Sequence, residues 1–213
     1  MIIPHVDLRS GHGPIRDQQA RPTCLAFSLS DLNGFQHKLP GMLSPEYLYR
    51  EAARLTPGWM PHQGTWLDAA LLAIDTPGQP EEANDPYQQD EPALPLVSAA
   101  KAPLYSGAYK KLPCAIATLD HALLVAGHSV GLAINLTPEF LTPDPGHAVI
   151  AFSPAFLPGS GHAVLVVGKG EHSVNGETHY LIRNSWGPSW GADGHAWLSQ
   201  RYIDTHALRI FGV

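Results

Sequence analysis

Residues 180–194 read Tyr-Leu-Ile-Arg-Asn-Ser-Trp-Gly-Pro-Ser-Trp-Gly-Ala-Asp-Gly. Their apolar start is typical of a buried strand, and the glycines, serines and proline after Arg183 predict a loop that leaves it. Asn-Ser-Trp-Gly followed by Ser-Trp-Gly is too specific a pattern for an ordinary turn. An earlier apolar run, Ala163–Val167, ends at Gly168, so the two runs predict neighbouring strands of one hairpin.

Helical periodicity dominates the first half of the chain, and strand-like runs dominate the second. Pro22 and Thr23 suit the first turn or cap of a helix that is expected to be buried on most of its surface, and Ser44 and Pro45 suit the start of the next. The expected helices cover residues 23–35, 45–54, 64–74 and 116–126, and the expected strands cover residues 130–136, 147–152, 163–167, 180–183 and 196–198, after an extended N-terminal segment. This order is typical of an α+β protein with two segregated lobes. Residues 75–114 are rich in proline and are expected to form a connector over the surface.

Composition excludes several classes of protein. At 213 residues with 44% apolar and 15% charged residues, the chain can bury a core and is not disordered. Its net charge is −6 and no basic run exceeds Lys110-Lys111, so neither nucleic acid nor an anionic membrane is an expected partner. No window has the ~20 apolar residues of a membrane span. With only two cysteines and no secretory signal, the expected location is the cytoplasm.

Three segments carry candidate chemistry. Cys24 stands at the start of the first expected helix, where the positive end of the helix dipole favours a thiolate, and Gln18 lies six residues before it. His162, in Gly-His-Ala-Val, opens the strand before the predicted hairpin, and Asn184 ends the strand after it. These residues lie 138 and 160 positions after Cys24 (162 − 24 and 184 − 24), an order and spacing typical of a cysteine nucleophile with a downstream histidine and asparagine.

These blocks resemble the papain family (C1-type) of cysteine peptidases, in particular its bacterial members that lack a pro-segment. The resemblance covers most of the chain and includes Val6-Asp7-Leu8-Arg9, Leu43-Ser44-Pro45-Glu46-Tyr47-Leu48-Tyr49, Gln63-Gly64-Thr65 and Asp85-Pro86-Tyr87. It implies one peptidase domain over residues 1–213 with a papain-like two-lobe fold. A mainly helical lobe, residues 1–104, would carry Cys24, and an antiparallel β-barrel lobe, residues 105–213, would carry His162 and Asn184 across an active-site cleft.

The resemblance also implies roles for single residues. Cys24 would be the nucleophile, His162 the general base and later the acid, Asn184 the residue that orients the imidazole, and Gln18 a donor to the oxyanion. Substrate would be bound by Gly64 and Trp186, with Ala133 and Ala163 at the second subsite leaving room for a bulky apolar side chain. A peptide or protein is the expected substrate, and no metal or cofactor is implied. The sequence starts where the family's mature domain would, so either a pro-segment has been removed or a separate inhibitor or regulator protein, or the compartment, would control activity.

The sequence departs from the family around the nucleophile. The family's Cys-Gly-Ser-Cys-Trp stands here as Arg21-Pro22-Thr23-Cys24-Leu25, so the upstream disulfide cysteine and the tryptophan after the nucleophile are both absent. The first loss fits a reducing compartment. The second removes an aromatic side chain that lines the cleft, and so bears on substrate preference and turnover.

Other residues could be mistaken for site residues. Gly146-His147-Ala148-Val149 repeats the His162 tetrapeptide, but His162 is preferred because its hairpin leads to Asn184, and His147 is expected at the surface or at a strand end. Cys114 is expected to be a core or partly buried thiol. The metal alternative depends on His121, His128, His172, His179 and His195; without a known ligand spacing, these are interpreted as scattered surface histidines.

The leading hypothesis is a cysteine endopeptidase that acts through an acyl-enzyme on Cys24. One alternative is a catalytically weak papain-fold module that binds peptides or proteins, motivated by the missing tryptophan. Another is an acyltransferase or isopeptidase that uses the same nucleophile with a different acceptor.

Overall fold

The computed structural model describes residues 1–94, 96, 103–144 and 146–213, and these form two compact units. Unit 1 comprises Met1–Asp17 and Lys111–Gly212, and unit 2 comprises Gln18–Lys110 with Val213. The boundary expected at residues 104 and 105 therefore lies six residues later. The N-terminal segment belongs with the C-terminal half of the chain, contrary to the expected 1–104 lobe, because its strand pairs there.

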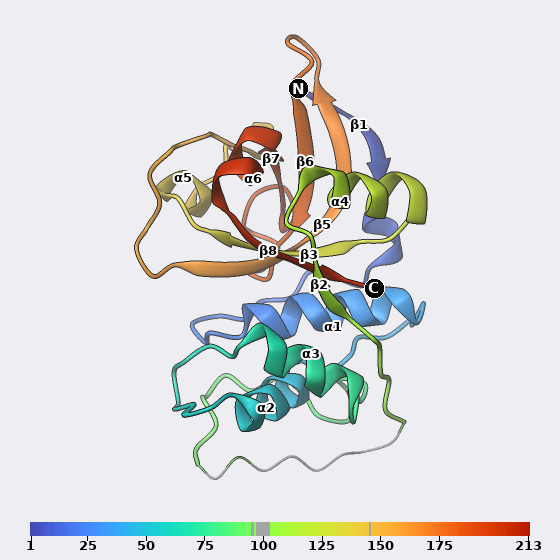
Figure 1. Ribbon diagram of the computed structural model, residues 1–213, viewed down its shortest axis with the longest axis vertical. Helices are drawn as coiled ribbons and strands as arrows, with labels where there is room; N and C mark the ends of the chain where they lie inside the picture. Colours follow the sequence, from blue (N-terminus) through green and yellow to red (C-terminus); the bar gives the residue numbers. More distant parts are fainter. Residues whose placement is uncertain (95, 97–102, 145) are drawn as a thin grey trace. The chain divides into compact units, whose positions relative to one another are not determined.

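Unit 2 is built on three helices that pack against one another: α1 (Cys24–Gln36), α2 (Pro45–Leu55) and α3 (Leu67–Asp75) (Figure 1). Helix α1 is buried on most of its surface, as its apolar spacing predicted, with Leu29 and Leu32 in the core. Burial of apolar side chains such as these supplies the main stabilising free energy of such a unit.

The predicted helix start is confirmed for α2, whereas the starts of α1 and α3 differ from the prediction. The Ser44 side chain accepts a hydrogen bond from Tyr47 N at 3.0 Å with Pro45 in the first turn, so the predicted cap of α2 is confirmed. Thr23 stands at the N-cap of α1 but makes no capping bond, because its hydroxyl bonds the Tyr87 hydroxyl at 2.9 Å instead. Helix α3 begins at Leu67, three residues later than expected.

The proline-rich segment 75–114 is not simply a surface connector, although its residues 95 and 97–102 lie outside the described residues. Gln79 is fully buried. Its side-chain amide donates to Ser30 Oγ at 2.8 Å and to Ser44 O at 2.9 Å, and it accepts from Asn33 Nδ2 at 3.1 Å. The segment is thus joined to α1 and to the start of α2 by polar side chains that a periodicity search does not detect.

Unit 1 is organised around a mainly antiparallel sheet (Figure 1). Its strands, among the described residues, follow the order β2-β8-β3-β5-β6-β7-β4, with β1 paired to β5 outside that path. They are β1 (Ile2–Asp7), β2 (Lys110–Leu112), β3 (Val130–Asn135), β4 (Val149–Ile150), β5 (Gly161–His172), β6 (Thr178–Arg183), β7 (His195–Ser199) and β8 (Ala207–Gly212).

The predicted α+β class is confirmed, but the expected closed antiparallel barrel is not formed. Among the described residues the hydrogen-bonded path ends at β2 and at β4, and the two-residue β4 pairs parallel with β7. Closure would need the terminal strands to pair with each other.

Helices and short turns complete unit 1. They are η1 (Arg9–Gly11), α4 (Ile116–Asp120), η2 (His121–Ala126), α5 (Pro138–Leu141) and α6 (Gln200–His206). The helix expected over residues 116–126 is present, but its second half, η2, is π-helical. The sequence did not predict α5, α6, β2 or β8. The sheet's core is apolar and includes Leu132, Val164 and Ile182. No helix in the described parts of the chain is long and apolar enough to span a bilayer.

Strand β5 has three neighbours because it is long. Its first half pairs with β3, its second half pairs with β1, and β6 runs along it with a register shift between Val166 and Gly168. Close approach of β1 requires glycine on β5: a Cβ at Gly168 would lie 2.6 Å from Val6 O, and one at Gly170 would lie 2.5 Å from Ile3 O.

Substitution Gly170→Ala should therefore destabilise the protein by about 1–3 kcal/mol, because the added methyl group overlaps the backbone of β1. The matched control is Gly34→Ala in α1, where a Cβ meets nothing within 4 Å; it should stabilise by roughly 0.5–1 kcal/mol through helix propensity. Chemical denaturation of both variants measures the difference. Equal stabilities for the two variants would mean that β1 is not held against β5 in solution.

Candidate functional site

His162 and Asn184 are brought together by the β5–β6 hairpin. His162 is the second residue of β5, Asn184 directly follows β6, and the two strands pair antiparallel. His162 Nε2 lies 2.7 Å from Asn184 Oδ1, and both side chains are buried. The structure therefore joins the histidine and asparagine that the sequence placed on neighbouring strands.

The hydrogen bonds around Asn184 fix the tautomer of His162. Asn184 Oδ1 accepts from Ser185 N at 2.9 Å, which identifies this atom as the amide oxygen. The nitrogen facing the same oxygen, His162 Nε2, must then carry a proton. In the neutral imidazole Nδ1 is consequently the free base, available to accept a proton.

Aromatic rings surround this hydrogen bond. The Trp186 ring lies 4.6 Å from the imidazole between centroids, and the Phe140 ring lies 5.9 Å away, edge to face. Phe140 is fully buried, and its backbone carbonyl accepts from Trp190 Nε1 at 3.1 Å. These apolar walls exclude water from a polar pair, which strengthens its hydrogen bond.

Burial also controls the charge of His162. Desolvation lowers the pKa of His162 to about 4, while the hydrogen bond to Asn184 acts in the opposite direction and is the weaker effect. The imidazole is therefore neutral near pH 7 unless an anion is placed beside it.

The loop that carries Trp186 is anchored at both ends. Asn184 N donates to Gly194 O at 2.9 Å, and Gly187 N donates to Arg16 O at 3.1 Å. Gly187 has φ +76°, a conformation that L side chains rarely adopt, and a Cβ there would also meet Asp17 Oδ2 at 3.1 Å. Trp186 thus packs its indole against His162, and Gly187 allows the backbone turn that follows.

Ala133 and Ala163 are directly opposite each other in the β3–β5 ladder. Because side chains alternate along a strand, Ala163 and its neighbour His162 point to opposite faces of the sheet. A separate hollow of about 450 Å³ lies beside Trp186 and Trp190, with Leu141 and Pro143 among its walls.

In unit 2, Cys24 is the first residue of α1 and is half-buried. Its place at the helix N-terminus, at the positive end of the helix dipole, favours negative charge on sulfur. Neither Cys24 nor Cys114 forms a disulfide bond.

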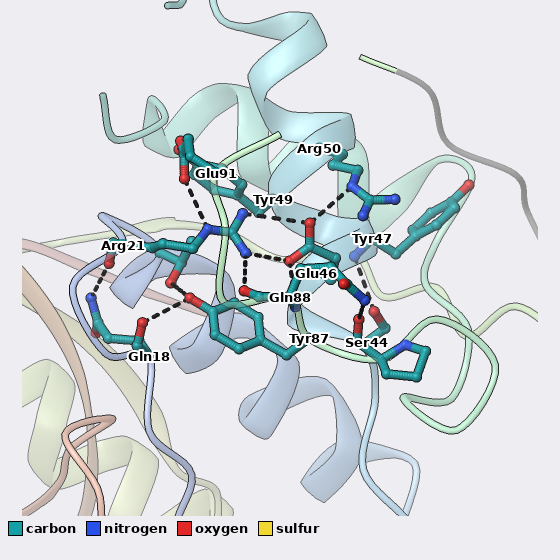
Figure 2. A network of polar contacts seen from close by, with 12 residues as sticks. Gln18, Arg21, Ser44, Glu46, Tyr47, Tyr49, Arg50, Tyr87, Gln88 and Glu91 are labelled. Carbon is teal, nitrogen blue, oxygen red and sulfur yellow. Dashed lines mark hydrogen bonds and ion pairs between the residues drawn. The ribbon is translucent and has the colours of Figure 1, made fainter. Parts of the chain in front are cut away.

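Gln18 and Gly64 also lie near the segment before α1. The Gln18 side chain is buried, and its Nε2 donates to Arg21 O at 2.8 Å (Figure 2). Gly64 is exposed, and a Cβ at this position would lie 3.8 Å from Pro22 O. Unit 2 thus groups Cys24, Gln18 and Gly64 around one loop, and unit 1 groups His162, Asn184 and Trp186.

The alternative site residues are dispersed. His147 lies at the surface, with Nδ1 3.4 Å from Asp144 Oδ2. Cys114 is exposed, contrary to the buried thiol expected, because it follows Pro113 in the link between β2 and α4. His179 and His195 are buried and not at the surface. Among the described residues, no group of three His, Cys, Asp or Glu side chains could hold a metal ion.

Sequence reasoning missed two features. Phe140 belongs to a four-residue helix without a motif. Arg21, Glu46 and Glu91 form a buried ion cluster beside Gln18 (Figure 2). A signal for the cluster was available in the sequence, because Glu46 stands among apolar residues in the first turn of α2 and Arg21 lies three residues before the nucleophile.

Comparison with known families agrees with this geometry. The family model described as papain family cysteine protease matches residues 3–208, across both units. The chain belongs to this family. Two relatives in the papain family are digestive cysteine proteinase 2 of Homarus americanus, 26% identical over 204 residues, and cathepsin B-like CP2 of Giardia intestinalis, 27% identical over 193. The alignments cover 88% and 84% of this chain, but 58% and 61% of those relatives.

Solved structures establish the papain-like fold. Xylellain, a cysteine protease from Xylella fastidiosa, aligns with a TM-score of 0.76 at 21% identity over 99% of this chain and 85% of its own. Bromelain from Ananas comosus, in complex with the E64 inhibitor, aligns with a TM-score of 0.74 at 20% identity over 99% of this chain and 98% of its own.

Stability should depend on pH through His162. Between pH 6.5 and about 4 the unfolded histidine binds a proton that the folded one does not, so the free energy of unfolding should decrease as pH falls through this window, by up to about 3 kcal/mol. A Cys24→Ala protein, which lacks the candidate nucleophile, is the background for the measurement. Replacing His162 by Ala in it should make the free energy of unfolding depend less on pH between these values, leaving the contribution of His195, whose pKa burial also lowers to about 4. An unchanged slope would contradict the assignment.

Proposed function

We propose that this protein is a cysteine endopeptidase that cleaves peptide bonds through an acyl-enzyme on Cys24. The observation that carries the proposal is the buried His162–Asn184 hydrogen bond, which leaves Nδ1 of the histidine as a base, in a chain of the papain family. A helix N-terminus that favours thiolate at Cys24 supports it.

In the proposed reaction, His162 Nδ1 takes the thiol proton and the Cys24 sulfur attacks the carbonyl carbon of the substrate. The carbonyl electrons move onto oxygen, where the Cys24 N–H and the Gln18 amide donate to the oxyanion. The C–N bond then breaks as His162 returns the proton to the amine. Water attacks the thioester with His162 again as the base, which releases the acid and restores the thiol.

Asn184 acts on His162 in this scheme and not on substrate, whereas Trp186 packs on His162 and also lines a hollow proposed to bind substrate. Asn184 accepts from Nε2–H of the imidazole and continues to do so when the ring is protonated, which stabilises the cation. Trp186 shields that bond from water. Gly64 offers backbone groups to an extended peptide, and the hollow beside Trp186 offers apolar walls to the residues after the scissile bond.

Several parts of the proposal depend on the sequence resemblance alone. These are a peptide or protein substrate, a separate inhibitor or regulator, and membership of the family's bacterial branch. A cytoplasmic location is also proposed, with two cysteines that form no disulfide in its favour.

An epoxysuccinyl inhibitor of E-64 type should add once to the wild-type protein, as seen by intact mass. Cys24→Ala should abolish the adduct and His162→Ala should slow it by more than about 100-fold, because the thiolate needs its base. Cys114→Ala, the matched thiol control, should react like the wild type. An adduct that persists in Cys24→Ala and disappears in Cys114→Ala would place the nucleophile elsewhere.

Hydrolysis of a fluorogenic peptide amide separates the proposal from its alternatives. Gln18→Ala should lower kcat by about 10²–10³-fold, because its amide is aimed at charge present only in the transition state. An adduct without hydrolysis would favour the peptide-binding alternative. Amide product formed faster than acid when an amine is added would favour acyl transfer.

Ala133 and Ala163 lead to a second substrate prediction. A peptide library varied at the second residue before the scissile bond should show preference for bulky apolar side chains. Ala133→Leu should lower kcat/KM for a leucine-containing peptide by about 10-fold or more, by filling the subsite, and should leave an alanine-containing peptide nearly unchanged. Preference for small or charged residues in the wild type would contradict this subsite assignment.

A further inference from the structure

A buried ion cluster lies beside Gln18 and includes Arg21, three residues before Cys24 (Figure 2). Arg21 Nε is 2.8 Å from Glu91 Oε2, and Arg21 Nη1 is 2.5 Å from Glu46 Oε2. The side chains of all three are at most 4% exposed. Arg50 contributes a second positive charge, with Nε 2.9 Å from Glu46 Oε1. Arg50 also lies 3.8 Å from a third carboxylate, Asp85 Oδ1, through its Nη1.

Four separate parts of unit 2 meet at the cluster. Arg21 belongs to the segment before α1, Glu46 to α2, and Glu91 to the proline-rich segment, whose Gln88 carbonyl accepts from Arg21 Nη1 at 2.6 Å. The fourth part is the loop that carries Gly64: His62 N donates to Glu91 Oε1 at 3.1 Å. Arg21 also stands where the family's upstream disulfide cysteine is absent from this sequence, so ionic hydrogen bonds join segments at this point.

Tyr87 transmits the cluster's geometry to the nucleophile segment. Its ring packs against the Arg21 guanidinium, 4.9 Å from the centroid, and edge to face on Phe27 of α1. The Tyr87 hydroxyl donates to Gln18 O at 2.8 Å, and the Thr23 hydroxyl lies 2.9 Å from the Tyr87 hydroxyl oxygen. One phenol thus bridges the residue proposed to bind the oxyanion and the residue immediately before Cys24.

The protonation states required for this bridge are stable at neutral pH. Burial raises the pKa of Tyr87, so the hydroxyl remains a donor to Gln18 O. Burial alone would lower the pKa of Arg21, but hydrogen bonds with Glu46 and Glu91 raise it above its ordinary value. A buried ion cluster adds little stability compared with apolar packing, yet its charge-assisted hydrogen bonds restrict geometry closely.

We propose that Arg21, Glu46, Glu91 and Tyr87 form a positioning device for the oxyanion-binding side of the site, in which the Tyr87 hydroxyl fixes Gln18 relative to the start of α1. This inference rests on the proposed function and deepens it. The four residues act through Gln18 and touch no substrate.

A double-mutant cycle tests whether Tyr87 acts through Gln18. Tyr87→Phe removes only the hydroxyl, and it should lower kcat for a peptide amide about 10-fold with KM changed less than about 2-fold, because a displaced donor weakens transition-state binding. In a Gln18→Ala background the same substitution should change kcat less than about 2-fold. Alkylation of Cys24 by iodoacetamide, which needs no oxyanion donor, should keep its rate in all four proteins.

Tyr109→Phe is the matched control. Tyr109 is also buried in unit 2, and its hydroxyl donates to Asn33 Oδ1 at 3.0 Å, away from Gln18. It should lower the melting temperature as Tyr87→Phe does without changing kcat. Glu91→Gln should reproduce the kcat effect and its dependence on Gln18; if that variant does not fold, Tyr87→Phe alone decides.

These experiments distinguish failure of the positioning role from failure of the proposed peptidase function. If the wild type hydrolyses peptides and the Tyr87→Phe effect is the same with and without Gln18, or if the Tyr109→Phe control lowers kcat equally, the positioning role is overturned and the proposed function stands. If the wild-type protein is folded and reduced but neither hydrolyses peptides nor is alkylated at Cys24, the proposed function and this inference both fail.

Discussion

Strand β5 pairs with three neighbours, and its register with each one decides where a functional side chain lies. Pairing with β6 places His162 within 2.7 Å of Asn184, pairing with β3 sets Ala163 opposite Ala133, and pairing with β1 uses glycines that admit its backbone. A slip of one residue would move His162 to the other face of the sheet, away from the Trp186 ring. The apolar core packed on β5 therefore fixes the position of His162 as well as stabilising the fold, because a slip would expose core side chains to water.

The two units hold their functional residues by different physical means. In unit 1 the sheet ladder and aromatic packing place an uncharged imidazole in apolar surroundings. In unit 2 the segment before Cys24 is held by side-chain hydrogen bonds. Gln18 Nε2 donates to Arg21 O, the Tyr87 hydroxyl donates to Gln18 O, and the Arg21 guanidinium donates to Glu46 and Glu91. Charge-assisted bonds suit that task since they restrain irregular backbone that regular secondary structure cannot.

The sequence predicted what local pattern determines. Periodicity located α1 and α2, the Ser44 cap marked the start of α2, and the hairpin argument placed His162 beside Asn184. It did not predict β8 or the pairing of the N-terminal strand with β5, because partners distant in sequence leave no local periodicity. It also interpreted residues 75–114 as a surface connector, since Gln79 and Glu91 look like solvated polar residues until their buried partners are known.

The discontinuity of unit 1 has a consequence for how the chain is made. All of unit 2 except Val213 is contiguous, so it can assemble as soon as Lys110 has been synthesised. Strand β1 is made before unit 2, yet its partner residues in β5 are made after unit 2, with Ile2 opposite His172. During translation β1 must therefore remain unpaired, with its backbone groups in water, until the helical unit and then β5 have been made.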